Sequence, residues 1–226
     1  MFEPIVHASS PITLLGGSDT DNSQLNICLK VAPSVVAADG GADHALRHDL
    51  RPVAVIGDMD SLSNKARTAF ADALHHVAEQ DSTDFEKCLT RIKAPLIMAA
   101  GFLGGRLDHT LAVLGTLARL RAHHVILVSP DDVCVLLPQG HSMWQLSPGL
   151  RAGVLPLGHA TVSSNGLVWD LADSKLAPDG LVSSSNAVKQ AQVSFDVAGP
   201  VLLTLPLSAS KSLIAGVLAQ VSSSAH

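Results

Sequence analysis

A basic surface is missing from this chain of 226 residues, which carries 15 lysines and arginines against 20 aspartates and glutamates. The formal net charge is −5, and no basic stripe is visible. Nucleic acid and acidic membrane surfaces are therefore not expected as partners, because clustered cations are needed to displace their counterions. No apolar run approaches the length that spans a membrane. These absences leave an enzyme or a small-molecule binding protein as the main expectations.

Cysteine is also scarce. Cys28, Cys88 and Cys134 lie far apart and form no CxxC pair, which favours a reducing compartment with each thiol in the core. The N-terminus carries Glu3 and Pro4 and lacks a basic region before an apolar run, so we expect no signal peptide and a cytoplasmic protein. The eleven histidines show no HxH or HExxH spacing.

Hydrophobic residues make up 47% of the chain, which is enough for a substantial core. Up to about residue 130, short apolar runs alternate with helical patterns, which predicts a Rossmann-like parallel sheet with helices on both faces. The expected strands are 12–15, 35–38, 53–56, 76–78, 96–100 and 125–128. The expected helices are 22–31, 42–47, 64–74, 85–92 and 107–121.

The pattern changes near Ser129-Pro130, after which short β-type runs are separated by glycine and proline. This predicts a small antiparallel β-sandwich, and hence an α/β domain over 1–130 and a sandwich domain over 131–226. The expected strands are 133–137, 154–157, 160–162, 167–171, 192–197 and 201–205. The apolar residues of 213–218 fit a helix or a strand equally, and the tail 222–226 is expected to fray.

Two carboxylates two residues apart follow the third expected strand, in Gly57-Asp58-Met59-Asp60-Ser61. Residues with this spacing on an extended segment project to the same side, and their charges repel unless hydrogen bonds or a cation offset them. Magnesium prefers a few carboxylates together with phosphate oxygens and water. The alternative is an ordinary turn, since Gly-Asp and Asp-Ser are common turn pairs.

Further polar groups follow other strands. Asp39 stands before Gly40-Gly41, and Gln80, Thr83 and Asp84 stand at an expected helix start, where Thr83 has capping spacing. Because ligands of parallel sheets bind at the carboxyl ends of strands, these groups are expected to meet at one edge. Turn formation and helix capping alone would also explain them.

A glycine pair precedes Arg106 and Asp108, both at the start of the last expected helix of the first half. Such a segment suits a phosphate, because the glycines allow close approach and the guanidinium binds phosphate oxygens. A plain Arg–Asp surface pair is the alternative. Together with the carboxylates, this segment predicts a magnesium-dependent enzyme that handles a nucleotide polyphosphate.

In the second half, Trp169 is one of two tryptophans and lies in Ser164–Leu171. A tryptophan in a small sandwich is usually part of the core, whereas an exposed one would stack on a flat heteroaromatic ring, more strongly on a cationic ring. The polar stretch Ser183–Asn186 offers groups that would recognise ring substituents, or it is a flexible loop.

With these segments in hand, the chain resembles the thiamine pyrophosphokinase family. The matching segments occur in the family's order over about 150 residues of both halves, and they are ADGGADHAL (38–46), IGDMDSL (56–62), QDSTDFEKCL (80–89), GGRLDHTL (104–111), SNGLVWDL (164–171) and SSSNAV (183–188). Ser184 stands where the family often has threonine, and the stretch after Gly199 matches poorly.

The resemblance implies an N-terminal α/β domain for ATP, a C-terminal β-sandwich that helps bind thiamine, and a homodimer with active sites between subunits. The implied reaction moves the β,γ-pyrophosphate of ATP to the thiamine hydroxyl and gives thiamine diphosphate and AMP. By motif, the implied roles are magnesium for Asp58, Asp60 and Asp84; ATP for Gln80, Thr83, Asp84 and Arg106; the acidic site for Asp39 and Asp108; and thiamine for Trp169, Ser185 and Asn186.

The hypothesis is an in-line attack by the thiamine oxygen on the β-phosphorus, with either Asp108 or Asp58 accepting the hydroxyl proton. A pyrophosphokinase for another heteroaromatic alcohol, such as a hydroxymethylpterin, would have a similar ATP half. A non-catalytic protein that binds a nucleotide or thiamine is the alternative from a different class.

Overall fold

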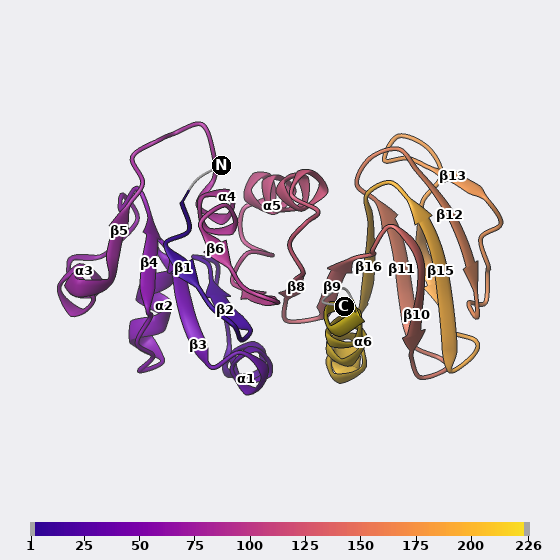
Figure 1. The fold of residues 1–226 in the computed structure, drawn as a ribbon, viewed down its shortest axis with the longest axis horizontal. Coiled ribbons are helices and arrows are strands. Elements are labelled where there is room, and N and C mark those ends of the chain that lie inside the picture. Colours follow the sequence, from indigo (N-terminus) through magenta and orange to yellow (C-terminus); the bar gives the residue numbers. More distant parts are fainter. Residues whose placement is uncertain (1–2, 224–226) are drawn as a thin grey trace. The chain divides into compact units, whose positions relative to one another are not determined.

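The computed structural model describes residues 3–223 and divides the chain into two compact units (Figure 1). One unit runs to Thr116 and takes up Leu127–Pro130, and the other comprises Leu117–Ile126 and the described residues from Asp131 on.

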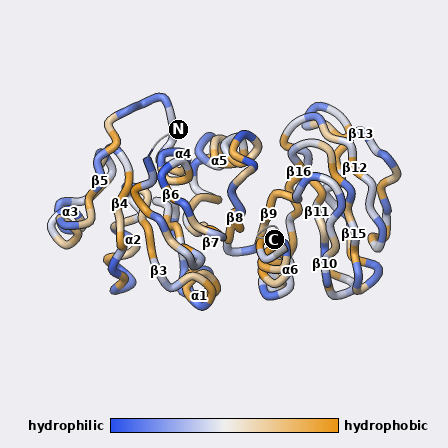
Figure 2. Tube along the Cα trace, viewed as in Figure 1, coloured by the Kyte–Doolittle hydropathy of each residue, from blue (hydrophilic) through white to orange (hydrophobic). Residues whose placement is uncertain are grey.

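The first unit is built on a parallel sheet in which β7, β2, β3, β4 and β5 follow one another; β8, the other neighbour of β7, is divided between the two units. These strands are β2 (Ile12–Leu15), β3 (Ser34–Ala38), β4 (Ala54–Gly57), β5 (Leu74–His76), β7 (Ile97–Ala100) and β8 (Val125–Val128). All residues of β2, β4, β7 and β8 are buried, as expected for strands covered on both faces. These strands appear as hydrophobic stretches between hydrophilic connections (Figure 2). The register pairs Leu14 with Val36 and with Ala99.

The strand order fixes which face each helix covers. The chain moves one way along the sheet from β2 to β5, then returns past β2 to β7, and right-handed crossovers place the helices before and after that return on opposite faces. The helices are α1 (Asn22–Val31), α2 (Gly41–Arg47), α3 (Asn64–Ala69), the 3-10 turn η1 (Ala71–Ala73), α4 (Asp84–Leu89) and α5 (Leu107–Arg119). A two-stranded parallel pair, β1 (Val6–His7) and β6 (Ile92–Lys93), completes the unit.

Three expected helices are shorter than the sequence pattern predicts, and the one expected over 107–121 ends at Arg119. The helix expected over 64–74 ends at Ala69, because Phe70 leaves helical geometry and Leu74 pairs with Val55 of β4. The helix expected over 85–92 ends at Leu89, because Ile92 pairs with Val6. By contrast, α1 begins as predicted, with Asp21 accepting from the Gln24 backbone N–H and the Gln24 side chain accepting from Asp21 in return.

The second unit contains two antiparallel groups of strands, β14-β11-β16-β9 and β10-β15-β12-β13. The bounds are β9 (Asp132–Leu136), β10 (Gly140–Gln145), β11 (Arg151–Pro156), β12 (Ala160–Asn165), β13 (Ser174–Leu176), β14 (Ser183–Ala187), β15 (Gln192–Ala198) and β16 (Val201–Pro206). Alternate residues of β10 and β15 are buried, including Trp144 and Phe195, so these strands turn one face to the core.

The second unit also corrects the sequence prediction at several points. Residues 167–171 are not a strand; they form a loop with a single bridge between Leu167 and Val188. The strands β10, β13 and β14 were not predicted, because their polar sequences contain no apolar run. The undecided segment 213–218 lies within a helix, α6 (Ser210–Ser223), preceded by the 3-10 turn η2 (Leu207–Ala209). Ser222 belongs to that helix, and 224–226 lie outside the described residues.

Within 3–223, none of the helices has the length and apolar character needed to cross a membrane.

Candidate active site

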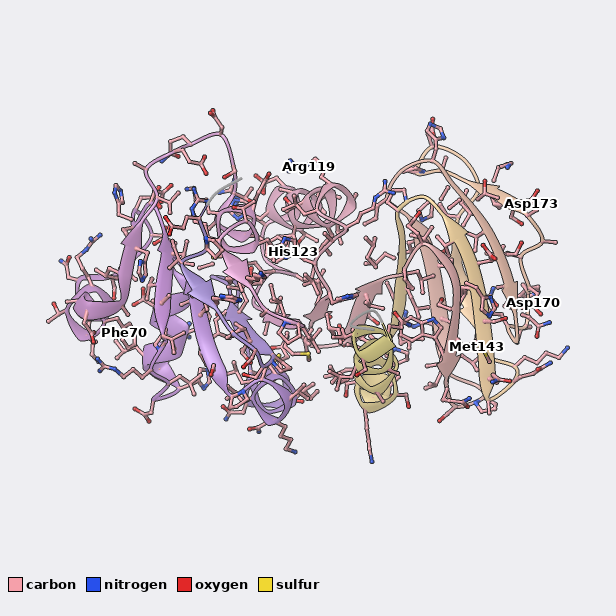
Figure 3. The ribbon with its side chains drawn as sticks, viewed as in Figure 1. Phe70, Arg119, His123, Met143, Asp170 and Asp173 are labelled. Carbon is pink, nitrogen blue, oxygen red and sulfur yellow. The ribbon has the colours of Figure 1, made fainter. Side chains whose placement is uncertain are left out.

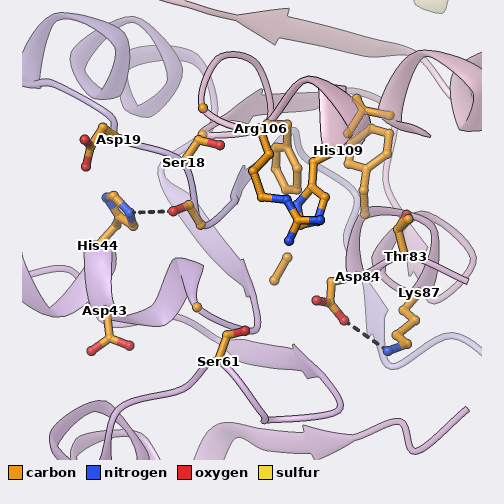
Figure 4. Close-up of a pocket in the computed structure, with 18 of the residues that line it drawn as sticks. Ser18, Asp19, Asp43, His44, Ser61, Thr83, Asp84, Lys87, Arg106 and His109 are labelled. Carbon is orange, nitrogen blue, oxygen red and sulfur yellow. Dashed lines mark hydrogen bonds and ion pairs between the residues drawn. The ribbon is translucent and has the colours of Figure 1, made fainter. Parts of the chain in front are cut away.

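A pocket of about 730 Å³ opens at the carboxyl ends of the parallel strands in the first unit (Figure 4). Its walls come from the segments that follow β2, β3, β4 and β7 and from the beginning of α4 and α5. The polar and charged side chains that line it are Ser18, Asp19, Asp43, His44, Asp58, Ser61, Ser82, Thr83, Asp84, Lys87, Arg106 and His109. This is the position at which open parallel sheets bind ligands.

Three carboxylates gather beside this pocket. Asp39, Asp58 and Asp60 each offer an oxygen, and these oxygens lie within 4.8 Å of one another. They range from buried Asp39 to exposed Asp60. Oxygen donors of this kind are the ones that magnesium prefers, so the donor set fits that ion.

Asp39 is the buried member of the carboxylate cluster, with 1% of its surface exposed. Its Oδ2 accepts from the Ser61 backbone N–H at 3.2 Å, whereas Oδ1 has no partner among the described residues. Burial, reinforced by the charges of Asp84 and Asp58, raises the pKa of Asp39 to about 7. A buried carboxylate oxygen without a donor is a second reason to expect a cation here.

Asp58 has the opposite electrostatic environment. Its Oδ2 accepts from Lys87 Nζ at 2.8 Å and from Gln80 Nε2 at 3.0 Å, and Oδ1 faces the Asp60 backbone N–H at 3.4 Å. The hydrogen bond from Lys87 is the main reason that the pKa of Asp58 is lowered to about 2. Asp58 is therefore ionised at neutral pH, and Gln80 is anchored on it.

Lys87 is one of the functional candidates that sequence reasoning missed. Its side chain is 2% exposed, and besides Asp58 it contacts Asp84 Oδ1 at 3.1 Å (Figure 4). Burial raises the pKa of Asp84, and Lys87 opposes that effect. The available signal was the spacing of Asp84 and Lys87, which places both on one side of a helix.

The strand ends leave no room for side chains at two glycines. A Cβ on Gly41 would lie 2.1 Å from the Leu15 carbonyl oxygen, and a Cβ on Gly57 would lie 2.7 Å from the Asp39 Cβ. Gly57 thereby allows the carboxylate of Asp39 to sit beside β4. The backbone itself forms this part of the site.

The glycine-rich segment before α5 contains two consecutive residues with left-handed backbone conformation. Gly104 and Gly105 both have positive φ, at 84° and 64°, which side chains disfavour. Arg106 follows, with Nε and Nη2 donating to the two oxygens of Asp108 at 3.1 and 2.5 Å. Both side chains are exposed, at 70% and 64%, so the predicted surface pair exists and its guanidinium remains accessible to a ligand.

Thr83 caps α4, accepting from the Glu86 backbone N–H at 3.3 Å, while also lining the pocket. His44 and Asp43 of α2 line the opposite wall and were not predicted. The His44 Nε2 lies 3.2 Å from the Gly17 carbonyl oxygen, and Arg47 Nη2 lies 2.9 Å from its Nδ1. Burial, with Arg47 nearby, lowers the pKa of His44, so it is a neutral donor to that carbonyl.

The three residues predicted from the second half lie in the second unit. Trp169 is 63% exposed, in contrast with buried Trp144, so it is not a core tryptophan. Ser185 is exposed on β14, whereas Asn186 is buried at 3% exposure. The stretch 183–187 is a strand rather than a flexible loop.

Comparison with known proteins decides the family. Residues 25–128 match the family model "Thiamin pyrophosphokinase, catalytic domain", and residues 151–202 match "Thiamin pyrophosphokinase, vitamin B1 binding domain". The chain belongs to the thiamine pyrophosphokinase family. The first match contains the carboxylate cluster, Lys87 and Arg106, and the second contains Trp169 and Asn186.

Curated relatives agree with this thiamine pyrophosphokinase assignment, and solved structures share the fold. The chain is 28% identical to thiamine pyrophosphokinase 1 of Arabidopsis thaliana over 206 residues, which covers 76% of this chain and 77% of the relative. It is 27% identical to thiamin pyrophosphokinase 1 of Caenorhabditis elegans over 191 residues, covering 76% and 78%. The fold resembles that of thiamin pyrophosphokinase from Candida albicans, with a TM-score of 0.75 at 19% identity over 89% of this chain and 92% of that one.

Proposed function

We propose that this protein transfers the β,γ-pyrophosphoryl group of ATP to the hydroxyl of thiamine, giving thiamine diphosphate and AMP. The observation that carries the proposal is the match to both thiamin pyrophosphokinase family models, with the carboxylate cluster in the first and the exposed Trp169 in the second. The vitamin B1 binding match favours thiamine over a hydroxymethylpterin as acceptor.

ATP would occupy the pocket of the first unit. Arg106, accessible beside Gly104 and Gly105, would bind polyphosphate oxygens, since a guanidinium donates two parallel hydrogen bonds. Thr83 lines the same pocket, and Gln80 holds Asp58 in place through its amide. The proposed ATP-binding residues are those predicted, Gln80, Thr83, Asp84 and Arg106, and the Gln80 amide also donates to the Asp58 carboxylate.

Magnesium would be held by Asp58 and Asp60, as predicted; Asp39 is the third carboxylate of the same cluster, and its Oδ1 has no hydrogen-bond partner among the described residues. Asp84 was the predicted third ligand, and it lies beside them in contact with Lys87. When bound, the ion would neutralise phosphate charge that the carboxylates alone would repel. Asp39 and Asp84 are thus the two candidates for the third ligand.

The proposed chemical step is a displacement at the β-phosphorus of ATP. The thiamine oxygen forms a bond to that phosphorus and its hydroxyl proton passes to water, the bond to the oxygen bridging the α- and β-phosphorus breaks, and AMP leaves with the electron pair. Positioning and charge neutralisation carry such reactions. Asp58 and Asp108 are weak bases here, because Lys87 and Arg106 respectively lower their pKa values.

The acceptor side would use the predicted residues Trp169, Ser185 and Asn186 of the second unit. An exposed indole suits a flat cationic ring system such as that of thiamine. We further propose a homodimer with active sites between subunits, which the family resemblance implies. Three free, buried cysteines suit a cytoplasmic enzyme.

The test is purified protein with ATP, magnesium and thiamine, with AMP and thiamine diphosphate measured by chromatography. We expect both products in equal amounts, and loss of turnover in Asp58→Asn. A parallel reaction with a hydroxymethylpterin should give no product. Calorimetric binding of ATP and thiamine without any turnover would overturn the proposal in favour of a binding protein.

A further inference from the structure

Asn186 has no free hydrogen-bonding capacity in this structure. A side-chain amide offers two N–H donors and two acceptor positions on its oxygen. Nδ2 donates to the Trp169 carbonyl oxygen at 2.7 Å and to Ser183 Oγ at 3.2 Å. Oδ1 accepts from the backbone N–H groups of Trp169 at 3.1 Å and Ala187 at 2.9 Å. Asn186 is 3% exposed, so its amide is buried and all of its partners are groups of the protein.

The bonds to Trp169 have the pattern of a β-ladder. The Asn186 amide gives one donor and one acceptor to the backbone of a single residue, as a strand partner would. Next to it, the Val168 N–H donates to the Ala187 carbonyl at 2.8 Å, and Leu167 bridges to Val188. Asn186 therefore extends a short backbone pairing by one residue, up to the tryptophan.

A second set of bonds fixes the same loop from within. Asp170, marked in Figure 3, accepts from the Leu167 N–H at 3.0 Å and the Gly166 N–H at 3.3 Å, and its Oδ1 also accepts from Ser164 Oγ at 3.1 Å. Gly166, with φ of 102°, allows the turn. Hydrogen bonds therefore hold the loop on both sides of Trp169, although Trp169 itself is 63% exposed.

We infer that Asn186 is a positioning residue that acts on the acceptor only through Trp169, by fixing the main chain from which the exposed indole projects. This inference rests on the proposed function, in which Trp169 stacks on thiamine. Because the four hydrogen-bonding positions of Asn186 are occupied, direct recognition of the acceptor would require one of these internal bonds to break. Holding the indole in advance reduces the entropy lost when a ring stacks on it.

A double-mutant cycle separates this role from direct contact. We expect Asn186→Ala to raise the KM for thiamine about tenfold, in line with the loss of one aromatic stacking interaction, while the KM for ATP changes less than about twofold. In a Trp169→Ala background, the same change should have no further effect. Gln190→Ala, an exposed change on the adjoining segment, is the matched control and should leave both constants unchanged. If the KM for thiamine in the double variant rises by the product of the two single effects, the inference is overturned.

A measurement without substrate tests the structural half of the inference even if thiamine is not the acceptor. The chain has two tryptophans, so 5-fluorotryptophan labelling gives two ¹⁹F resonances, and the buried Trp144 reports whether the unit stays folded. We expect Asn186→Ala to move the Trp169 resonance and leave that of Trp144 in place. If that variant does not fold, Asn186→Asp keeps the shape, removes both donors and should give the same shift. An unchanged Trp169 resonance in a folded variant would overturn the inference.

Discussion

The ammonium group of Lys87 on α4 lies 2.8 Å from a carboxylate oxygen of Asp58, which follows β4. The same group lies 3.1 Å from Asp84. Lys87 is nearly inaccessible to solvent, so Asp58 and Asp84 share one buried ammonium group. Removal of one partner from such a group leaves buried charge without compensation.

Lys87→Met should therefore destabilise the protein by about 3 kcal/mol in the absence of divalent ions. Magnesium should stabilise this variant more than it stabilises the parent, because the ion would then meet two uncompensated carboxylates. Urea denaturation with and without magnesium measures both effects. Lys65→Met, an exposed change on α3, is the control and should behave like the parent. Equal magnesium stabilisation of parent and Lys87→Met would contradict the expectation.

Substitutions distinguish Asp39 from Asp84 as the third magnesium ligand. Asp39→Asn and Asp84→Asn each remove one carboxyl group from neighbouring positions, but only Asp39 lies in the cluster with Asp58 and Asp60. We expect Asp39→Asn to weaken magnesium binding about tenfold or more and Asp84→Asn to weaken it less. Manganese binding followed by electron paramagnetic resonance gives the comparison. A larger loss in Asp84→Asn would assign the third position to that residue.

The raised pKa of Asp39 gives a pH dependence with a definite sign. Its pKa rises from 3.8 to about 7 on folding, so its contribution to stability is complete below about pH 4 and is lost as pH rises through 7. Without magnesium, the stability advantage of the parent over Asp39→Asn should fall across this window, by at most about 1.4 kcal/mol per pH unit. Denaturation at a series of pH values tests this, and a difference independent of pH would contradict it.

Arg106 is expected to act on ligand rather than on the fold, because its pair with Asp108 is solvent-exposed. Arg106→Ala should weaken ATP binding about tenfold or more without changing the melting temperature, and Arg106→Lys should restore little of it, since lysine lacks the two-pronged geometry. Calorimetry with a non-hydrolysable ATP analogue measures the affinity. Arg51→Ala, which breaks the exposed pair with Asp72, serves as the control. Full recovery in Arg106→Lys would show that charge alone suffices.

Hydrophobic patterning located the parallel strands because these strands are buried on both faces. The run at 12–15 is reproduced residue for residue in β2. The same reasoning failed for β14, whose sequence Ser-Ser-Ser-Asn-Ala carries no apolar signal, and for 167–171, where Asp170 bends an apolar run into a loop. Side-chain hydrogen bonds to backbone compete with strand pairing, and single-sequence periodicity does not record them.

Carboxylates at strand ends were predictable because topology alone brings such ends together. Asp39 and Asp58 meet as expected. Lys87 was missed because a lysine near the end of a short helix ordinarily extends into solvent, and its burial depends on tertiary packing of α4 against β4. The sequence also did not predict that every hydrogen-bonding position of the Asn186 amide is used, because one partner, Trp169, lies in a loop 17 residues away.

The close approach of backbone at Gly41 and Gly57 restricts how this pocket can change during evolution. A side chain at either position would collide with the Leu15 carbonyl or with Asp39, so even alanine would displace the strand ends. Adaptation to a different nucleotide must then proceed through the surrounding side chains, such as His44 and His109, which line the pocket. Related sequences with altered donor preference should differ at these wall positions while keeping both glycines.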